Sequence, residues 1–319
     1  MKKILITGGT GFLGKRLGKK FKELGYDVLL TGRNNKQNFF AEKFSGCEVC
    51  AMDVANIETV RDTVIAYKPD AIIHAAATKF VDMAEKYPLE TVDINVIGSQ
   101  NIARVAIDKG IQLVIGISTD KSAPPVRNTY GLTKALMERL FCSLEGKSNT
   151  HFLCVRYGNV AWSTGSVLCI WRKMIEETGL IETTGPEMTR FFFTVDNAVD
   201  LVRVAFENRE NLYGRVLSRK MKSAKLEQIL KIWTEIEKVS YQKIQGRPGE
   251  RNDEYLIGEL ELPYTRVQNY SGIEHYIISF NEKADIPLLK SLSSSNAERL
   301  TDNEIVEIVN NPPPEEKYE

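Results

Sequence analysis

The sequence predicts an α/β fold in which a doubly wound parallel sheet is followed by a smaller C-terminal α/β lobe. Short runs of apolar residues alternate with amphipathic stretches through the first half of the chain, and a glycine-rich turn directly follows the first run. Runs that are apolar throughout fit strands buried on both faces of a parallel sheet. Their alternation with helical stretches is typical of βαβ units.

Six runs are expected to form the strands of this sheet. The first helix is indicated by Leu13, Leu17, Phe21 and Leu24, which recur at helical spacing, and Gly25 ends it. The expected strands are Ile4–Ile6, Val28–Leu30, Cys47–Met52, Ala71–His74, Leu113–Ile117 and His151–Tyr157.

The regular alternation ends near residue 162, which predicts two lobes. Residues 1–162, joined by a helical stretch at about 191–212, are expected to form the dinucleotide-binding lobe. Residues from about 163–190 and 213–308 are expected to form the smaller lobe. Residues 309–319 are rich in proline and charge, so we expect a disordered tail.

Composition excludes several classes of protein. Lys+Arg and Asp+Glu both number 42 in 319 residues, so nothing indicates a nucleic-acid or anionic-membrane partner. No apolar run is long enough for a transmembrane helix or a signal peptide. The five cysteines are an odd number, which fits a reducing cytoplasm. Cys47 and Cys50 fall on opposite faces of an expected strand, so we expect no metal site.

The glycine-rich turn predicts a dinucleotide site because it follows a strand and opens a helix. Gly8 permits the tight turn, Gly11 lets the backbone approach a pyrophosphate, and Gly14 lets the helix pack closely on the sheet. The free N–H groups at the helix start would face the phosphates. A glycine turn without a ligand is the alternative. The other residues of the turn expected at the cofactor are Thr10, Phe12 and Leu13.

The end of the second expected strand bears on the choice of cofactor. An NAD site favours a carboxylate there, but this chain has Arg33, which can pair with a 2′-phosphate. We therefore favour NADP, with NAD as the alternative. Asp53 and Val54 follow the third strand, where Asp53 is placed to accept from the adenine amino group. Ala75 and Ala76 offer the small side chains that a close cofactor contact needs.

Tyr130 and Lys134 lie four residues apart and share one face of an expected helix. A tyrosine is a poor base at neutral pH, and lowering its pKa from about 10 to about 7 takes roughly 4 kcal/mol. The Lys134 ammonium and a positively charged nicotinamide could supply that stabilisation. Tyr130 would then accept a proton from a sugar hydroxyl, while Lys134 also holds the nicotinamide ribose.

A second acid–base pair follows the fifth expected strand. Asp120 can protonate a leaving hydroxyl, and Lys121 can remove a proton from carbon next to a carbonyl. Thr119 could hydrogen-bond the sugar oxygen beside Tyr130. Simple hydride transfer does not need this pair, so it favours elimination of water. A solvated Asp-Lys turn is the alternative.

On these residues the chain resembles the extended short-chain dehydrogenase/reductases. Within them it is most similar to the nucleotide-sugar 4,6-dehydratases that act on UDP-N-acetylglucosamine, of the polysaccharide-biosynthesis type. The resemblance spans nearly the whole chain. Its further segments are His74–Lys79, Asn95–Gly98, Arg156–Val160, Pro186–Phe191 and Gly246–Glu250.

The resemblance implies a mechanism and a substrate site. Hydride leaves carbon 4 as Tyr130 takes the hydroxyl proton, Lys121 removes the carbon-5 proton, Asp120 protonates the departing carbon-6 hydroxyl, and the hydride returns to carbon 6. Tyr130 favours members that also invert carbon 5, since some retaining members have Met there. The expected substrate residues are Lys79, Asn159, Met188, Thr189, Arg190, Arg247 and Glu250.

Several alternatives stay open. A nucleotide-sugar 4-epimerase or reductase typically needs only Tyr130 and Lys134, and a catalytically silent NADP-binding regulator is a third reading. The family usually has Gly-Ser-Arg-Gly where this chain has Trp162–Gly165, a change expected to reshape the sugar pocket or a subunit contact. The apolar face formed by Leu132, Leu136 and Leu140 predicts a homo-oligomer.

Overall fold

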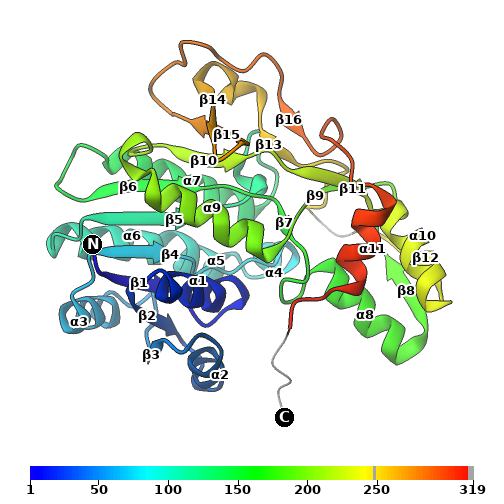
Figure 1. Ribbon diagram of the computed structural model, residues 1–319, viewed down its shortest axis with the longest axis horizontal. Coiled ribbons are helices and arrows are strands. Elements are labelled where there is room, and N and C mark those ends of the chain that lie inside the picture. The colour runs from blue at the N-terminus through cyan, green and yellow to red at the C-terminus, as the bar shows by residue number, and fades with distance from the viewer. Residues whose placement is uncertain (247–248, 315–319) are drawn as a thin grey trace.

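The structure is a computed structural model and describes residues 1–246 and 249–314. A nine-stranded sheet with helices on both faces forms most of the molecule, and a smaller lobe lies at one end of the strands (Figure 1). The strand order is β14-β15-β10-β6-β5-β4-β1-β2-β3. The seven strands from β10 to β3 are parallel to one another, so the predicted doubly wound sheet is confirmed.

The predicted apolar runs coincide with the buried central strands. Every residue of β4 and β5 is buried, because helices cover both faces of the sheet. The strands of this sheet are β1 (Lys3–Thr7), β2 (Asp27–Gly32), β3 (Glu48–Ala51), β4 (Ala71–His74), β5 (Leu113–Ile117), β6 (His151–Val155), β10 (Val216–Arg219), β14 (Thr265–Tyr270) and β15 (Ile273–Ile278).

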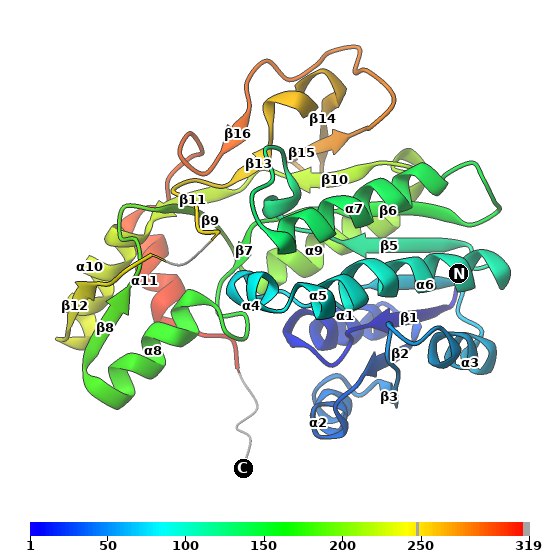
Figure 2. The ribbon, with the colours of Figure 1, turned by 180° about the vertical axis from the view of Figure 1, so that it is seen from behind.

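Two layers of helices enclose this sheet. In Figure 1, α1 and α9 pack together on the near face, and Figure 2 shows α3, α6 and α7 on the other. The helices are α1 (Phe12–Glu23), α2 (Asn35–Ser45), α3 (Ile57–Tyr67), α4 (Val81–Lys86), α5 (Pro88–Val92), α6 (Gly98–Asp108), α7 (Thr129–Leu144) and α9 (Val195–Glu207).

Within the described residues, the smaller lobe contains three short sheets and three α-helices. Its strands pair as β11-β9-β7, β12-β8 and β13-β16. The elements are β7 (Asn159–Val160), α8 (Val167–Thr178), β8 (Leu180–Thr183), β9 (Thr189–Phe193), β11 (Lys222–Lys225), α10 (Leu226–Glu237), β12 (Ser240–Lys243), β13 (Tyr255–Ile257), β16 (Leu292–Ser293) and α11 (Asp302–Asn310).

Strands β10, β14 and β15 fall within the range 213–308 that the sequence assigned to the smaller lobe. They are hydrogen-bonded to the central sheet, where β15 runs antiparallel to both β10 and β14. The outermost strand, β14, is largely exposed and carries no continuous apolar run, so periodicity could not assign it to the sheet.

The smaller lobe has an apolar core of its own around Trp162, Trp171 and Trp233. Trp162 adopts φ +61°, a left-handed conformation that costs a non-glycine residue roughly 1–2 kcal/mol. Its ring packs edge-on against Trp233, and its Nε1–H donates to the Ile308 carbonyl at 2.6 Å. Trp162 thus attaches α11 to the lobe, which is a structural role that the sequence did not indicate.

The C-terminal segment returns to the first helix of the chain. Arg16 Nη2 donates to the Pro314 carbonyl at 3.3 Å, so residues beyond α11 reach α1. The expected tail begins at 309, still inside α11, and its last five residues, 315–319, lie outside the described residues. Across residues 1–246 and 249–314, no helix is both long and apolar enough to cross a membrane.

Candidate active site

The glycine turn lies where the strand order reverses, between β1 and β4, which is where doubly wound sheets bind ligands. Gly8 has φ +62°, and a Cβ on it would lie 2.6 Å from the Ala76 nitrogen. At Gly14 a Cβ would lie 2.3 Å from the Gly8 carbonyl oxygen. Glycine is therefore required at both positions for the turn and its helix to pack.

Gly11 is different, because it is exposed and a Cβ on it would approach only the Gly8 oxygen, at 3.2 Å. It is the N-cap of α1 and has no side chain to satisfy the first N–H groups of that helix. An anion at this position would meet free backbone donors. Thr10, Phe12 and Leu13 are partly exposed around it. The turn therefore fits the pyrophosphate of a dinucleotide.

Arg33 and Asp53 come together at the ends of β2 and β3. Arg33 Nη1 lies 3.8 Å from Asp53 Oδ2, and both side chains are substantially exposed. Val54 is buried beside them, where its Cγ2 would lie 2.7 Å from a Cβ at Gly98. A cation and a carboxylate therefore lie together at the ends of β2 and β3, where the sequence predicted the adenosine part of the cofactor.

Buried polar residues hold the segment that follows β4. His74 Nδ1 hydrogen-bonds Thr7 Oγ1 at 2.8 Å, and its Nε2 hydrogen-bonds Ser99 Oγ at 3.0 Å. Burial lowers the pKa of His74 to about 3, so the ring is neutral. Asn95 accepts from the Thr78 N–H at 2.8 Å and donates to Thr133 Oγ1 at 3.0 Å. Asn95 thus fixes the segment at Thr78 against α7, a role that no local pattern in the sequence indicated.

The Asp120–Ser122 turn directly follows β5 and places Lys121 among three acceptors. Lys121 Nζ donates to Asp120 Oδ1 at 3.1 Å and to Asn159 Oδ1 at 3.3 Å. Glu254 Oε1 lies 3.5 Å from the same nitrogen. The three oxygens around Lys121 Nζ match the three N–H donors of a protonated lysine, so the site suits an ammonium. Sequence reasoning missed Glu254, because only the folded chain brings this residue to β5.

The two carboxylates of this cluster keep free oxygens. Asp120 and Glu254 are both buried, yet Asp120 Oδ2 and Glu254 Oε2 have no hydrogen-bond partner among the described residues. Burial lowers the pKa of Lys121, but the charges of Asp120 and Glu254 outweigh it and raise the pKa above its usual value, with Arg190 opposing them. Lys121 is therefore charged in this state and must lose a proton before it can act as a base.

Tyr130 lies in the first turn of α7, beside the same cluster. Burial raises the pKa of Tyr130 to about 12, and Lys121 and Thr119 act in the opposite direction. The sequence assigned this effect to Lys134. Here Lys134 is buried with Nζ 3.3 Å from Met137 Sδ, and burial lowers the pKa of Lys134 to about 8. The cation that acts on Tyr130 in this structure is thus Lys121.

A second buried cluster lies behind these residues. Arg156 Nε and Nη2 donate to Glu138 at 3.0 and 2.6 Å, and Nη1 and Nη2 donate to Glu261 at 2.9 and 2.8 Å. The Ser122 hydroxyl donates to Glu138 Oε1 at 2.8 Å. Glu138 follows Lys134 by one helical turn, so this cluster connects α7 to the Asp120–Ser122 turn and to the smaller lobe.

Two glycines permit close packing at this site. A Cβ on Gly158 would lie 3.1 Å from Asp120 Oδ2 and 2.6 Å from the Cβ of Phe191. A Cβ on Gly258, which follows β13, would lie 1.9 Å from the Pro124 carbonyl oxygen. The segment that contains Glu254 therefore packs directly on the chain that follows Lys121.

Residues 4–274 match the polysaccharide biosynthesis protein family. The chain belongs to this family. An uncharacterized membrane protein of Methanocaldococcus jannaschii is 35% identical over 277 residues, 82% of this chain and 82% of the relative. A UDP-glucose 4-epimerase of Rickettsia typhi is 31% identical over 329 residues, 97% of this chain and 95% of the relative.

Solved structures agree with this assignment. The structure of Pen from Bacillus thuringiensis superimposes with a TM-score of 0.89 at 28% identity, covering 98% of this chain and 97% of Pen. The predicted membership of the extended short-chain dehydrogenase/reductases, of the polysaccharide-biosynthesis type, is confirmed.

Three of the substrate residues inferred from the family, Met188, Thr189 and Arg190, lie in or next to β9 and contact other protein groups in this structure. Arg190 donates to the carbonyls of Arg251 and Asn252 at 2.8 and 3.0 Å, so it holds the Glu254 segment in this structure. Thr189 bonds the Asp253 carboxylate and Ser294. Met188 is buried, with its sulfur 3.0 Å from Arg190 Nη2.

The remaining inferred substrate residues are more peripheral. Glu250 accepts from the Thr184 hydroxyl at 2.9 Å, and Lys79 is exposed after β4. Arg247 lies outside the described residues. Among all the inferred substrate residues, only Asn159 makes a direct hydrogen bond to Lys121 in the described chain.

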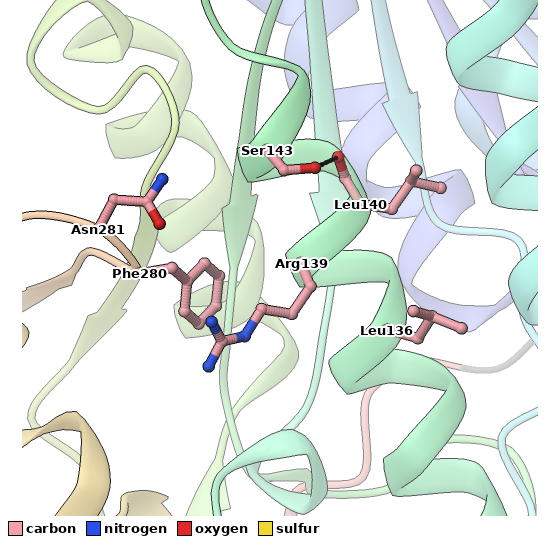
Figure 3. Close-up of a pocket in the computed structure, with 6 residues that line it drawn as sticks. All are labelled: Leu136, Arg139, Leu140, Ser143, Phe280 and Asn281. Carbon is pink, nitrogen blue, oxygen red and sulfur yellow. Dashed lines mark hydrogen bonds between the residues drawn. The ribbon is translucent and has the colours of Figure 1, made fainter.

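A hollow of about 340 Å³ lies on the outer face of α7 (Figure 3). Arg139 lies 4.0 Å over the ring of Phe280 and forms part of its wall, and Leu136 beside it is 52% exposed. The buried residues of α7, including Lys134 and Glu138, belong to the opposite face of this helix. This hollow is therefore separate from the acid–base cluster.

Proposed function

We propose that this protein dehydrates UDP-N-acetylglucosamine to a UDP-4-keto-6-deoxy-N-acetylhexosamine, with NADP as its cofactor. The observation that supports this most strongly is the Asp120–Lys121 pair, 3.1 Å apart at the carboxyl end of β5 and next to Tyr130. Membership in the polysaccharide biosynthesis protein family supports a nucleotide sugar as substrate.

A bound nicotinamide dinucleotide would supply the acceptor that takes hydride from carbon 4 and returns it to carbon 6. Tyr130, once deprotonated to the phenolate, takes the proton of the carbon-4 hydroxyl, with Thr119 beside it. Lys121, as a neutral amine, removes the carbon-5 proton that the carbon-4 carbonyl has made acidic. Asp120 protonates the departing carbon-6 hydroxyl, and Lys121 returns its proton to carbon 5. At the end of a turnover Tyr130 holds a proton that Asp120 has lost, so a proton must pass from Tyr130 to Asp120 before the next turnover.

The cofactor site supports NADP over NAD through one residue. Arg33 is exposed at the end of β2, where a guanidinium can pair with a 2′-phosphate. Asp53 and its neighbour Val54 would face the adenine, and Ala75 and Ala76 the dinucleotide. Arg33→Ala is expected to raise the KM for NADP about ten-fold and leave the KM for NAD within about two-fold. Equal changes in both values would contradict the preference.

The smaller lobe would hold the nucleotide part of the substrate. Arg190 and Glu250 lie on segments that meet in this lobe, and Asn159 contacts Lys121. Lys79, Met188, Thr189 and Arg247 complete the proposed set. Arg190 would serve in two ways, because its guanidinium also holds the Arg251 and Asn252 carbonyls.

Mass spectrometry tests the reaction directly. The protein is incubated with UDP-N-acetylglucosamine and a catalytic amount of NADP⁺, and the product is expected to lack one water. Lys121→Ala and Tyr130→Phe should each slow this loss by about 10²-fold or more, because each removes a proton-transfer group. If the wild-type protein binds NADP⁺ but performs no reaction, the alternative that it is a catalytically silent NADP-binding regulator is favoured.

A UDP-sugar 4-epimerase is the second candidate, and it is supported by the 31% identical epimerase of Rickettsia typhi. An epimerase leaves the mass of the substrate unchanged, and a reductase consumes NADPH stoichiometrically. Epimerisation also needs no base at carbon 5, so Lys121→Ala would leave it largely active. The same incubation therefore separates dehydration from epimerisation, and a second incubation with stoichiometric NADPH detects a reductase.

We also propose that the protein is a homo-oligomer that pairs through the outer face of α7. Leu132 and Leu136 are 57% and 52% exposed there, and the hollow beside Phe280 adjoins them. Light scattering of wild type and of a Leu132→Glu, Leu136→Glu variant should show a smaller mass for the variant. Equal masses would argue against this face.

A further inference from the structure

Glu254 is the second carboxylate at Lys121, and the steps above assign it no task. It reaches the cluster from the smaller lobe, just before β13, whereas Asp120 and Lys121 follow β5. Its backbone N–H donates to Ser294 Oγ at 3.0 Å, and the Ser294 N–H donates to its carbonyl at 2.8 Å. These two bonds fix the main chain from which the Glu254 carboxylate extends towards Lys121.

The two carboxylates have different hydrogen-bond environments. Asp120 Oδ1 accepts from both Thr119 Oγ1 and Lys121 Nζ, at 2.9 and 3.1 Å. Glu254 has one cation within range, Lys121 at 3.5 Å, and its Oε2 is a buried oxygen without a donor among the described residues. Asp120 Oδ1 is therefore shared between the Thr119 hydroxyl and Lys121 Nζ, whereas Glu254 Oε1 faces Lys121 Nζ and the neighbouring Oε2 is open to a proton.

The chemistry of the proposed reaction leads to the same assignment. Asp120 must carry a proton on one oxygen in order to give it to the carbon-6 hydroxyl, and the free Oδ2 is available for that proton. Lys121 must lose a proton at the same stage. Once Asp120 is an acid, Glu254 is the one carboxylate left within 4 Å of Lys121 Nζ in the described chain.

We propose that Glu254 accepts the third proton of Lys121 when substrate binds, which makes Lys121 the neutral base. The exchange is Lys121–NH₃⁺ plus Glu254–COO⁻ giving Lys121–NH₂ plus Glu254–COOH, and no other atom moves. After Lys121 has returned the carbon-5 proton, the reverse exchange restores the resting pair. Glu254 acts through Lys121 and is therefore a positioning residue. This inference rests on the proposed dehydration.

The charged and titratable groups around Lys121 come from four elements. Asp120 lies in the same turn, Tyr130 in α7, Arg190 in β9 and Glu254 before β13. Arg190 opposes the charge of Lys121, so it assists the loss of the proton. Glu254→Gln has nearly the same shape but cannot accept a proton, so it isolates the exchange from packing.

The test separates oxidation at carbon 4 from proton removal at carbon 5. Each protein reacts with UDP-N-acetylglucosamine in deuterated water, with reduced nicotinamide followed by absorbance and deuterium at carbon 5 by NMR. Glu254→Gln is expected to form reduced nicotinamide within about three-fold of wild type, while deuterium enters carbon 5 about 10²-fold more slowly. Glu254→Asp should recover part of that loss.

Glu259→Gln is the matched control, because Glu259 is an exposed acid on the same segment and should behave as wild type. The inference is overturned if Glu254→Gln exchanges carbon-5 hydrogen as fast as wild type or faster, since Asp120 alone would then suffice. It is also overturned if the variant loses carbon-4 oxidation to the same extent. A wild-type protein that shows neither exchange nor loss of water would instead refute the proposed function.

Discussion

Two buried clusters in this molecule each contain one cation and two carboxylates, yet they differ in how their oxygens are used. Around Arg156, both oxygens of Glu138 and both oxygens of Glu261 accept hydrogen bonds from the guanidinium. Around Lys121, one oxygen of Asp120 and one of Glu254 have no partner among the described residues. The two clusters contain the same charges, but only in the Arg156 cluster are all four carboxylate oxygens hydrogen-bonded.

The difference separates a group that holds the fold from a group that performs chemistry. A saturated ion cluster has no free lone pair for a substrate, and breaking it leaves a buried charge uncompensated. An unsaturated cluster costs stability because its free oxygens are desolvated, and it keeps those oxygens available to donors that arrive with a ligand. Changes in the first should therefore reduce stability, and changes in the second should reduce activity.

The largest expected effect is at Glu138. Glu138→Gln places an amide N–H₂ against the donors of Arg156 and is expected to lower the free energy of unfolding by about 3–5 kcal/mol. Urea unfolding at pH 7 measures it. A loss below about 1 kcal/mol would remove the distinction between the two clusters.

The next effect concerns Trp162, whose strained backbone is offset by packing. Trp162→Gly loses an aromatic side chain worth about 3–5 kcal/mol but relieves about 1–2 kcal/mol of left-handed strain. We expect a net loss of about 2 kcal/mol in urea unfolding. Trp162→Ala keeps the strain and should be about 1 kcal/mol less stable than the glycine variant. The reverse order would mean that φ +61° costs nothing here.

His74 extends the comparison to a neutral group whose two ring nitrogens are both bonded. Its pKa is about 3 in the folded protein, against about 6.5 when unfolded. Between these values the unfolded chain binds the extra proton, so stability falls as the pH drops below 6.5. At pH 5.5 the expected loss from this residue is about 1.4 kcal/mol. Between pH 7 and pH 5.5, urea unfolding of His74→Gln should therefore show a pH dependence weaker than that of wild type by about 1.3 kcal/mol.

The smallest expected effect is the stability of Glu254→Gln. This substitution removes one of two carboxylates that share a single ammonium. The ion pair of Lys121 and Asp120, whose net charge is zero, remains. Its free energy of unfolding should stay within about 1 kcal/mol of wild type. Because Glu138→Gln is the same chemical change at a saturated site, the two variants form a matched pair. A loss at Glu254 as large as that at Glu138 would contradict the comparison.

Much of the first lobe could be predicted from the sequence, because its signals are local. Apolar runs predicted the strands β1, β4 and β5, and glycine spacing predicted the turn in which Gly8 adopts a left-handed backbone conformation. Asp120, Lys121 and Tyr130 could be placed together because parallel strands bring their carboxyl ends to one edge.

The remainder depends on contacts between segments far apart in the chain. Glu254 meets Lys121 only after the segment before β13 has folded onto the β5 turn, and no spacing in the sequence records that approach. Spacing predicted that Lys134 would act on Tyr130, but in the structure Lys134 Nζ contacts Met137 Sδ and the cation that acts on Tyr130 is Lys121. The hydrogen bonds of Arg190 to two backbone carbonyls likewise have no local signature.

The close approach of Gly258 to Pro124 has a consequence for the reaction. A Cβ at position 258 would lie 1.9 Å from the Pro124 carbonyl oxygen, so any side chain there would push the segment that contains Glu254 away from the chain that follows Lys121. The distance between Lys121 and Glu254, across which the proposed proton transfer takes place, therefore depends on a residue that takes no part in that transfer.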